Sequence, residues 1–249
     1  AKLHYFALQS SKTGIRVDFY RVNALIELKK AGFSYGGGDI FRDVDLHLTK
    51  GSFHFLTGPS GSGKTTLMKM CYQALMPSSG TIKVFGKDVR AMDRDDIATV
   101  RRRIGVVHQD CQFLDHLSVA ENILLPSQVS GRDITKDVAN LQQLLKWVAL
   151  TSRMDALPPQ LSGGERQRAA LARAVILSPE VIIADEPTGN LDWQMAQRLL
   201  ELLIELNKMG KTVLMATHDM NLIRASRSAV SARVLRIQGK QVHLAGADL

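Results

Sequence analysis

The sequence is poor in several features that would each point to a class of protein. Its 249 residues include only two cysteines, Cys71 and Cys111, which are too few and too isolated for a disulfide framework or a zinc site. No run approaches the ~20 apolar residues that span a bilayer. Polar and charged residues interrupt the first apolar residues of the chain, unlike a secretory leader. We therefore expect reduced thiols and a cytoplasmic protein with no membrane span of its own.

Acidic residues are also in the minority, since 32 lysines and arginines face 24 aspartates and glutamates and give a net charge of +8. Such a charge invites a nucleic-acid-dependent function. The basic residues are dispersed, however, and the densest group, Arg101–Arg103, runs directly into an apolar segment. Neither aromatic interleaving nor a groove-reading motif accompanies them. Two interpretations of this group stay open, a solvated helix face and a functional basic patch, and we expect no specific nucleic-acid partner.

The most informative motif is a glycine-rich segment that fits G-x-x-x-x-G-K-[ST] at every fixed position. An apolar strand-like segment, residues 53–57, precedes it, and a helix-like segment from residue 66 follows it. Backbone N–H groups at a helix start bind phosphate, and glycines let the backbone close around it. The lysine would reach the outer phosphates of a nucleoside triphosphate, and the threonine would ligate Mg²⁺. The nucleotide-binding residues predicted here are Gly58, Pro59, Ser60, Gly61, Ser62, Gly63, Lys64, Thr65 and Thr66.

A second acidic motif complements this loop. The apolar run Val181–Ala184 leads into Asp185 and Glu186. A buried strand that ends in a carboxylate provides the second protein ligand that Mg²⁺ needs, opposite Thr65. The carboxylate of Glu186 would orient or deprotonate the attacking water. Together the two motifs predict an ATP-hydrolysing enzyme.

Strand-like and helix-like segments alternate over most of the chain, which predicts an α/β fold with a mainly parallel sheet. Residues 1–23 lack a clear period and are interpreted as an N-terminal extension, with one domain over residues 24–249. Near the start of that domain, two alternating segments predict an antiparallel β region at the edge. Residues from about 110 to 176 are largely helical by pattern, and about 110–167 are interpreted as a helical subdomain. Five residues there recur at helical spacing and predict an apolar stripe: Val138, Leu141, Leu144, Leu145 and Val148.

A further motif, Leu161-Ser-Gly-Gly-Glu-Arg-Gln167, closely resembles the signature sequence LSGGQ of ATP-binding-cassette (ABC) ATPases, with Glu165 where glutamine is usual. The resemblance covers residues 24 to about 240. It implies a P-loop NTPase core, an inserted ABC helical subdomain, and a homodimer in the ATP-bound state. In that dimer each ATP would lie between the phosphate loop of one chain and Ser162, Gly163 and Gly164 of the other.

Other positions fit the same family in the expected order. The resemblance implies that Gln109 contacts Mg²⁺, that His218 contacts the γ-phosphate and that Tyr35 stacks on adenine. It further implies that Asn190–Asp192 crosses the dimer interface. Glu186, His218 and Gln109 are thus the predicted catalytic residues, and ATP and Mg²⁺ the predicted substrate and cofactor.

Within the family, the segment from Ala184 to Asp192 looks like the group of cell-division, lipoprotein-release and macrolide-efflux ATPases. The segment from Val213 to Ile223 is most similar to the cell-division members, called FtsE. That resemblance implies a peripheral protein at the cytoplasmic face of a bacterial inner membrane. Its partner would be an FtsX-like transmembrane subunit, and its dimer cycle would control septal cell-wall hydrolases. A lipoprotein-release or macrolide-efflux ATPase is the alternative.

The surface that meets such a partner is predicted after Gln109, where Phe113, Leu114, Leu117 and Val119 cluster. Packing within the helical subdomain explains the same cluster, and both interpretations stay open. An exposed apolar patch would favour docking.

Overall fold

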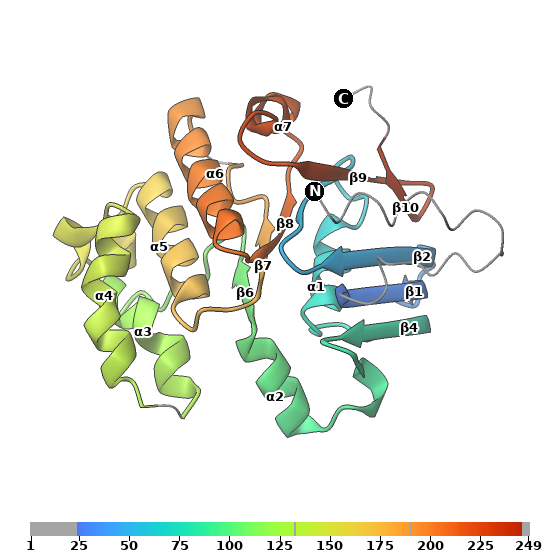
Figure 1. Cartoon of the computed structure of the whole chain (residues 1–249), viewed down its shortest axis with the longest axis horizontal. Helices are drawn as coiled ribbons and strands as arrows, with labels where there is room; N and C mark the ends of the chain where they lie inside the picture. Colours follow the sequence, from blue (N-terminus) through green and yellow to red (C-terminus); the bar gives the residue numbers. More distant parts are fainter. Residues whose placement is uncertain (1–23, 132, 190, 246–249) are drawn as a thin grey trace, which may run out of the picture.

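The computed structural model describes residues 24–131, 133–189 and 191–245 of the chain. These residues form an α/β arrangement in which the helices α3, α4 and α5 lie to one side of a central sheet and a smaller sheet lies to the other (Figure 1). The strands are β1 (Ala24–Ser34), β2 (Asp39–Thr49), β3 (Phe53–Thr57), β4 (Ser79–Val84), β5 (Lys87–Asp88), β6 (Ile104–Val107), β7 (Val181–Asp185), β8 (Thr212–Ala216), β9 (Ala232–Gln238) and β10 (Gln241–Leu244). The helices are α1 (Lys64–Cys71), α2 (Arg94–Arg102), α3 (Val119–Val129), α4 (Thr135–Trp147), α5 (Gly163–Val175), α6 (Trp193–Lys208) and α7 (Met220–Ser226).

The central sheet has the strand order β10-β9-β3-β8-β7-β6. Neighbours from β9 to β6 are parallel, and only β10 pairs antiparallel, through the hairpin with β9. Packing on both faces, by helices on one and by α1 and the smaller sheet on the other, buries β3, β7 and β8 completely, which explains why these strands are largely apolar. The carboxyl ends of β3 and β7 carry the phosphate loop and the acidic pair, so the sheet brings the two motifs to one edge.

The smaller sheet is antiparallel, with the order β2-β1-β4-β5. Its inward residues and one face of α1 share a core with alternate residues of the central sheet, including Leu56 and Ile183. A second core lies under α3 to α6 and contains the other faces of β3, β7 and β8. The two cores therefore pack on β3 and α1, the strand and the helix that the phosphate loop joins. The predictions of a mainly parallel sheet, an antiparallel edge region and a helical insertion are confirmed.

Several predicted elements agree with the structure to within a residue or two. The strand at residues 53–57 has the predicted bounds, and the predicted strand Val181–Ala184 extends by one residue to Asp185. Part of the predicted apolar stripe on α4 is wrong, because Val138 is 45% exposed whereas Leu141 and Leu145 are buried. The helix begins only at Thr135, so Val138 lies in its first turn, at the exposed end of the stripe. The predicted N-terminal extension at residues 1–23 lies outside the described residues.

Among the described residues no helix is long and apolar enough to cross a membrane.

A buried histidine on β3 makes the stability of this fold depend on pH. Burial lowers the pKa of His54 from 6.5 to about 4, and the charge of Arg233 contributes to the same decrease. The unfolded chain therefore binds a proton that the folded chain excludes as the pH falls from 6.5 towards 4. The free energy of unfolding should be almost unaffected by His54 above pH 6.5. Between pH 7 and pH 5 it should fall by about 2 kcal/mol through this residue. Urea unfolding of wild type and His54→Gln at the two pH values checks this, since the extra loss should vanish in the variant. An equal loss in both proteins would contradict it.

Candidate active site

The phosphate loop joins the end of β3 to the start of α1, and its backbone needs glycine. Gly63 is the N-cap of α1 and has φ 103°, while Gly61 has φ 75°. A Cβ on Gly63 would lie 2.8 Å from Cζ of Phe41 and 2.9 Å from Cγ2 of Ile40. The loop therefore combines left-handed backbone with a close approach to β2, and only glycine satisfies both. This shape points the first N–H groups of α1 into an open cavity.

That cavity has a volume of about 650 Å³ and brings together residues from distant parts of the chain. The loop forms one wall, and the ends of β6, β7 and β8 contribute side chains to the others. Most of the residues predicted from the sequence to bind or hydrolyse ATP meet here. The lining consists of Tyr35, Ile40, Gly58, Pro59, Ser60, Gly61, Gly63, Lys64, Thr65, Thr66, Gln109, Asp185, Glu186, Gly189 and His218.

The carboxylate of Glu186 lies between two other predicted site residues. Its Oε2 is 2.9 Å from Nδ1 of His218, and its Oε1 is 3.4 Å from Nζ of Lys64. The side chains of Glu186 and Lys64 are 11% and 10% exposed, whereas that of His218 is 71% exposed. Glu186 directly follows β7 and has φ 45°, a left-handed conformation that turns the chain sharply at this point. Its carboxylate therefore faces the cavity with one neighbour on each side.

Lys64 also makes hydrogen bonds within the phosphate loop. Its ammonium donates hydrogen bonds to the carbonyl oxygens of Gly58, at 2.9 Å, and Pro59, at 3.3 Å. These two carbonyls and the carboxylate of Glu186 together surround the largely buried ammonium of Lys64. A phosphate that enters the loop offers stronger, charged acceptors to the same ammonium. Binding of a nucleotide would thus free Glu186 from Lys64 at the moment that the substrate arrives.

The donor set suits Mg²⁺ held jointly by protein and nucleotide. Oδ1 of Asp185 is buried without a hydrogen-bond partner among the described residues, at the end of β7. Thr65, in the first turn of α1, contributes a hydroxyl to the same cavity. The described residues contain no cluster of three or more His, Cys, Asp or Glu side chains that could hold a metal ion alone. Mg²⁺ in such sites takes one or two carboxylates and completes its shell with phosphate oxygens and water, so the residues fit this ion.

Tyr35 provides a flat apolar surface at the mouth of the cavity. Its side chain is among the large hydrophobic groups left exposed, at 61%, and its hydroxyl lies 3.5 Å from Oγ1 of Thr66. An edge-to-face contact with the ring of Phe33, at 4.7 Å between ring centroids, helps to fix the position of the Tyr35 ring. An exposed ring held in place beside a phosphate loop can stack on a base.

The signature residues lie elsewhere. Ser162 is the N-cap of α5, and Gly163 and Gly164 form its first turn. Neither the serine nor the glycines belong to the described lining of the cavity around Lys64. The start of α5, where Ser162 and Gly163 are exposed, is therefore a second helix N-terminus that could bind an anion, separate from the first. Asn190 of the predicted interface segment lies outside the described residues.

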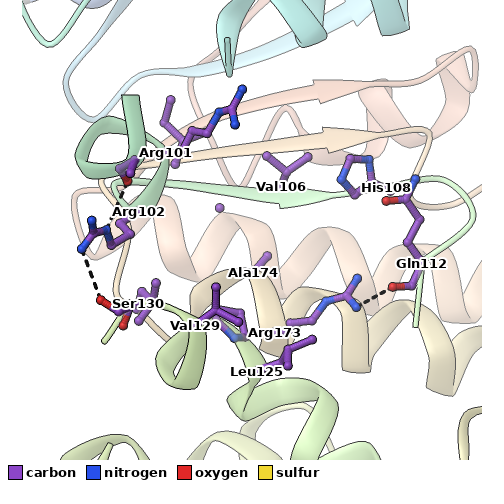
Figure 2. Close-up of a pocket in the computed structure, with 15 residues that line it drawn as sticks. Arg101, Arg102, Val106, His108, Gln112, Leu125, Val129, Ser130, Arg173 and Ala174 are labelled. Atoms are coloured by element: carbon purple, nitrogen blue, oxygen red, sulfur yellow. Dashed lines mark hydrogen bonds between the residues drawn. The ribbon is translucent and has the colours of Figure 1, made fainter. Parts of the chain in front are cut away.

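A second cavity, of about 550 Å³, is lined by residues of α2, β6, α3 and α5 (Figure 2). Arg102 donates a hydrogen bond to the carbonyl of Ser130 at one end, and Arg173 donates one to the carbonyl of Gln112 at the other. Val129 lies at the edge and is 79% exposed. His108 lines this cavity while the adjacent Gln109 lines the first. One short segment after β6 thus contacts both cavities.

The apolar cluster predicted after Gln109 divides in the structure. Val119 is buried in the core as the first residue of α3, so this member packs. Leu114 is 42% exposed. Phe113 is partly buried against the same core and lies under the guanidinium of Arg173, at 4.6 Å. Packing therefore accounts for Val119 and part of Phe113, whereas Leu114 stays exposed.

Comparison with known proteins agrees with this geometry. Residues 41–189 match the ABC transporter family. The chain belongs to this family. It is an ATPase, as the family match and a solved relative with bound ADP and phosphate both support.

The chain is similar to the following three proteins, among others. The lipoprotein-releasing system ATP-binding protein LolD 1 of Rhodopirellula baltica is 42% identical over 185 residues, 74% of this chain and 81% of that protein. The cell division ATP-binding protein FtsE of Escherichia coli K12 is 40% identical over 211 residues, 84% of this chain and 92% of that protein. The dimeric post-hydrolysis structure of the ATP-binding cassette MJ0796 with ADP and Pi has a TM-score of 0.77 and 30% identity, and covers 88% of this chain and 96% of that one.

Sequence reasoning missed two residues of the ATP cavity. Ile40 lies beside Tyr35, at the start of β2, and carries no chemical group that a motif could reveal. Gly189 follows the acidic pair, and its N–H donates a hydrogen bond to the carbonyl of Glu186 at 3.1 Å. Gly189 lies within the segment from Ala184 to Asp192 that identified the group within the family, and this position could have indicated it.

Proposed function

We propose that this chain is the ATP-hydrolysing subunit of an FtsE-type membrane complex, with residues 24–249 as a single ABC ATPase domain. The observation that carries the catalytic part is one cavity that gathers Lys64, Thr65, Asp185, Glu186 and His218. Likeness to FtsE over 84% of the chain supports the cell-division part. The protein would act at the cytoplasmic face of a bacterial inner membrane with an FtsX-like transmembrane subunit, and would control septal cell-wall hydrolases.

In the proposed reaction, Lys64 and the N–H groups of α1 bind the phosphates of ATP while Tyr35 stacks on adenine. Thr65 and Asp185 would hold Mg²⁺, with Gln109 beside it; the ion neutralises charge on the phosphates when it is bound. Glu186 accepts a proton from the attacking water, and its hydrogen bond to His218 keeps the carboxylate aimed at the γ-phosphate.

A second copy of the chain completes each site in this proposal. Ser162, Gly163 and Gly164 bind the γ-phosphate held by the partner, which explains why the signature lies outside the cavity of its own chain. Loss of that phosphate after hydrolysis removes the bridge between the two copies. The dimer therefore closes on ATP and opens on ADP.

The second cavity is the proposed docking place for the transmembrane subunit. Arg101, Arg102 and Arg173 make its lining cationic, so an intracellular segment with apolar and acidic side chains is complementary to it. The segment that joins His108 to Gln109 links this cavity to the ATP site. Movement of the docked segment could thereby follow the state of the nucleotide.

Two exposed valines allow a matched test of this docking place. Val129→Asp puts a charge at the edge of the cavity, whereas Val138→Asp puts the same charge on α4, outside the described lining. We expect Val129→Asp to reduce co-purification of the transmembrane subunit at least tenfold, while Val138→Asp retains it. Nucleotide binding should be equal in both, as measured by fluorescence titration. Equal losses of the subunit in both variants would contradict the assignment.

The identity of the partner is tested by purification of Glu186→Gln with ATP from detergent-solubilised membranes of its own cell. Recovery of an FtsX-like protein supports the division role. Recovery of a lipoprotein-release permease favours the alternative that the likeness to LolD 1 supports, and an efflux permease favours the macrolide-type alternative. A nucleic-acid-dependent ATPase would instead show DNA-stimulated, steeply salt-dependent hydrolysis.

A further inference from the structure

Glu165, the residue that departs from the usual signature, places a negative charge at the start of α5. Its carboxylate closes a capping box: Oε2 accepts a hydrogen bond from the N–H of Ser162 at 2.8 Å, and the Glu165 N–H donates to Oγ of Ser162 at 3.3 Å. The hydrogen bond from Ser162 is the main reason that the pKa of Glu165 lies below its ordinary value. The carboxylate is therefore ionised at neutral pH.

This charge opposes the role that the helix start has in the proposed function. An α-helix N-terminus carries about half a positive charge, which a full negative charge beside it outweighs. A phosphate brought there by a second chain would meet net repulsion. The start of α5 needs a compensating cation to accept an anion.

Arg153 supplies that cation from another element. Its Nε lies 3.0 Å from Oε1 of Glu165, the oxygen opposite the one that Ser162 occupies. The side chain of Glu165 is 18% exposed and that of Arg153 49% exposed, so the pair lies at the surface beside the start of α5. Arg168, whose charge also interacts with that of Glu165, donates its Nε–H to the carbonyl of Val148.

The backbone of Arg153 is fixed independently of this pair. It ends a short 3₁₀ turn, Thr151–Arg153, whose preceding residue Leu150 is fully buried. The Arg153 N–H donates to the carbonyl of Leu150, and Ala120 of α3 donates to the carbonyl of Met154. The guanidinium is therefore presented to Glu165 by a rigid turn, and loss of the side chain alone leaves that turn anchored.

We propose that Arg153 is a positioning residue for ATP hydrolysis: it neutralises Glu165 and holds its carboxylate in the capping box, so that Ser162 can receive the γ-phosphate of ATP bound by a second copy. The inference rests on the proposed two-chain site. Arg153 does not touch the nucleotide of its own chain and acts only through Glu165.

A double-mutant cycle tests this role. Arg153→Gln should lower the ATP hydrolysis rate at least about tenfold, the size expected for one charge-assisted contact, with ATP affinity of the monomer changed less than twofold. In the Glu165→Gln background the same arginine change should have no effect, because no carboxylate remains to neutralise. Arg153→Lys should recover most of the rate. Arg224→Gln, which removes an exposed arginine on α7, is the matched control.

Two outcomes overturn the inference. If Arg153→Gln hydrolyses ATP as fast as wild type, the cation is not needed. If the arginine change is equally harmful in the Glu165→Gln background, Arg153 serves only the stability of the turn. Ser162→Asp, measured in parallel, tests the underlying two-chain site, since aspartate caps a helix as well as serine but repels phosphate. An active Ser162→Asp overturns both proposals, whereas an inactive Ser162→Asp beside an active Arg153→Gln overturns the inference alone.

Discussion

Glu186→Gln should hydrolyse ATP about 10²–10⁴ times more slowly than wild type, the usual contribution of a positioned general base. The amide keeps the shape of the carboxylate but cannot take a proton from water. ATP affinity should persist, because Lys64 keeps its two loop carbonyls as partners and loses only the carboxylate that competes with phosphate. Steady-state phosphate release and fluorescent-nucleotide titration measure the two quantities.

The same variant should accumulate as an ATP-bound dimer, since the bridge between the two chains is no longer removed by hydrolysis. Size-exclusion chromatography with light scattering should give twice the monomer mass with ATP and the monomer mass with ADP. His218→Ala is a useful companion, because it removes the second neighbour of Glu186 and should slow turnover without changing nucleotide affinity greatly. Wild-type turnover by Glu186→Gln would refute its assignment as the base.

Lys64→Ala should lose most of its affinity for ATP. Hydrogen bonds to charged groups contribute about 1.5–3 kcal/mol each, so the loss of one ammonium weakens binding at least ~10–100-fold. The variant also leaves the largely buried Glu186 without its cation, although His218 still bonds to it. Hydrolysis should then fall through weaker binding, with a raised KM.

A control keeps this prediction specific. Lys69, in the last turn of α1, is a second lysine of the same helix, outside the described lining of the cavity. Lys69→Ala should bind ATP as wild type does, by the same titration. Unchanged affinity in Lys64→Ala would show that the loop does not hold the phosphates through this ammonium.

The parts of the site that a short stretch of sequence specifies could be predicted. Two motifs are of this kind: the phosphate loop after β3, and the acidic pair at the end of β7. In each, a strand, a turn and the reactive side chains lie within about ten residues. Parallel pairing then brings the two motifs together, because β3 and β7 flank β8 and end at the same edge. Fold class and most of the cavity lining follow from that topology.

Contacts between distant turns could not be predicted. The ion pair of Lys64 with Glu186 depends on how far a left-handed turn swings the carboxylate. The pair of Arg153 with Glu165 joins a turn without a motif to a helix start. The exposure of Val138 follows from where α4 begins, and the N-cap of that helix is Ile134, which makes no side-chain hydrogen bond.

The central claim, that each ATP site is shared by two chains, is tested most directly by mixing two inactive variants. Glu186→Gln lacks the base, and Ser162→Asp lacks a usable signature. In a mixed dimer, one site carries both defects and the other carries neither. Mixed in equal amounts before ATP is added, the two proteins should recover about a quarter of the wild-type rate per chain, because random pairing makes half of the dimers mixed, with one intact site in each. A mixture that stays as inactive as its components would contradict the shared site.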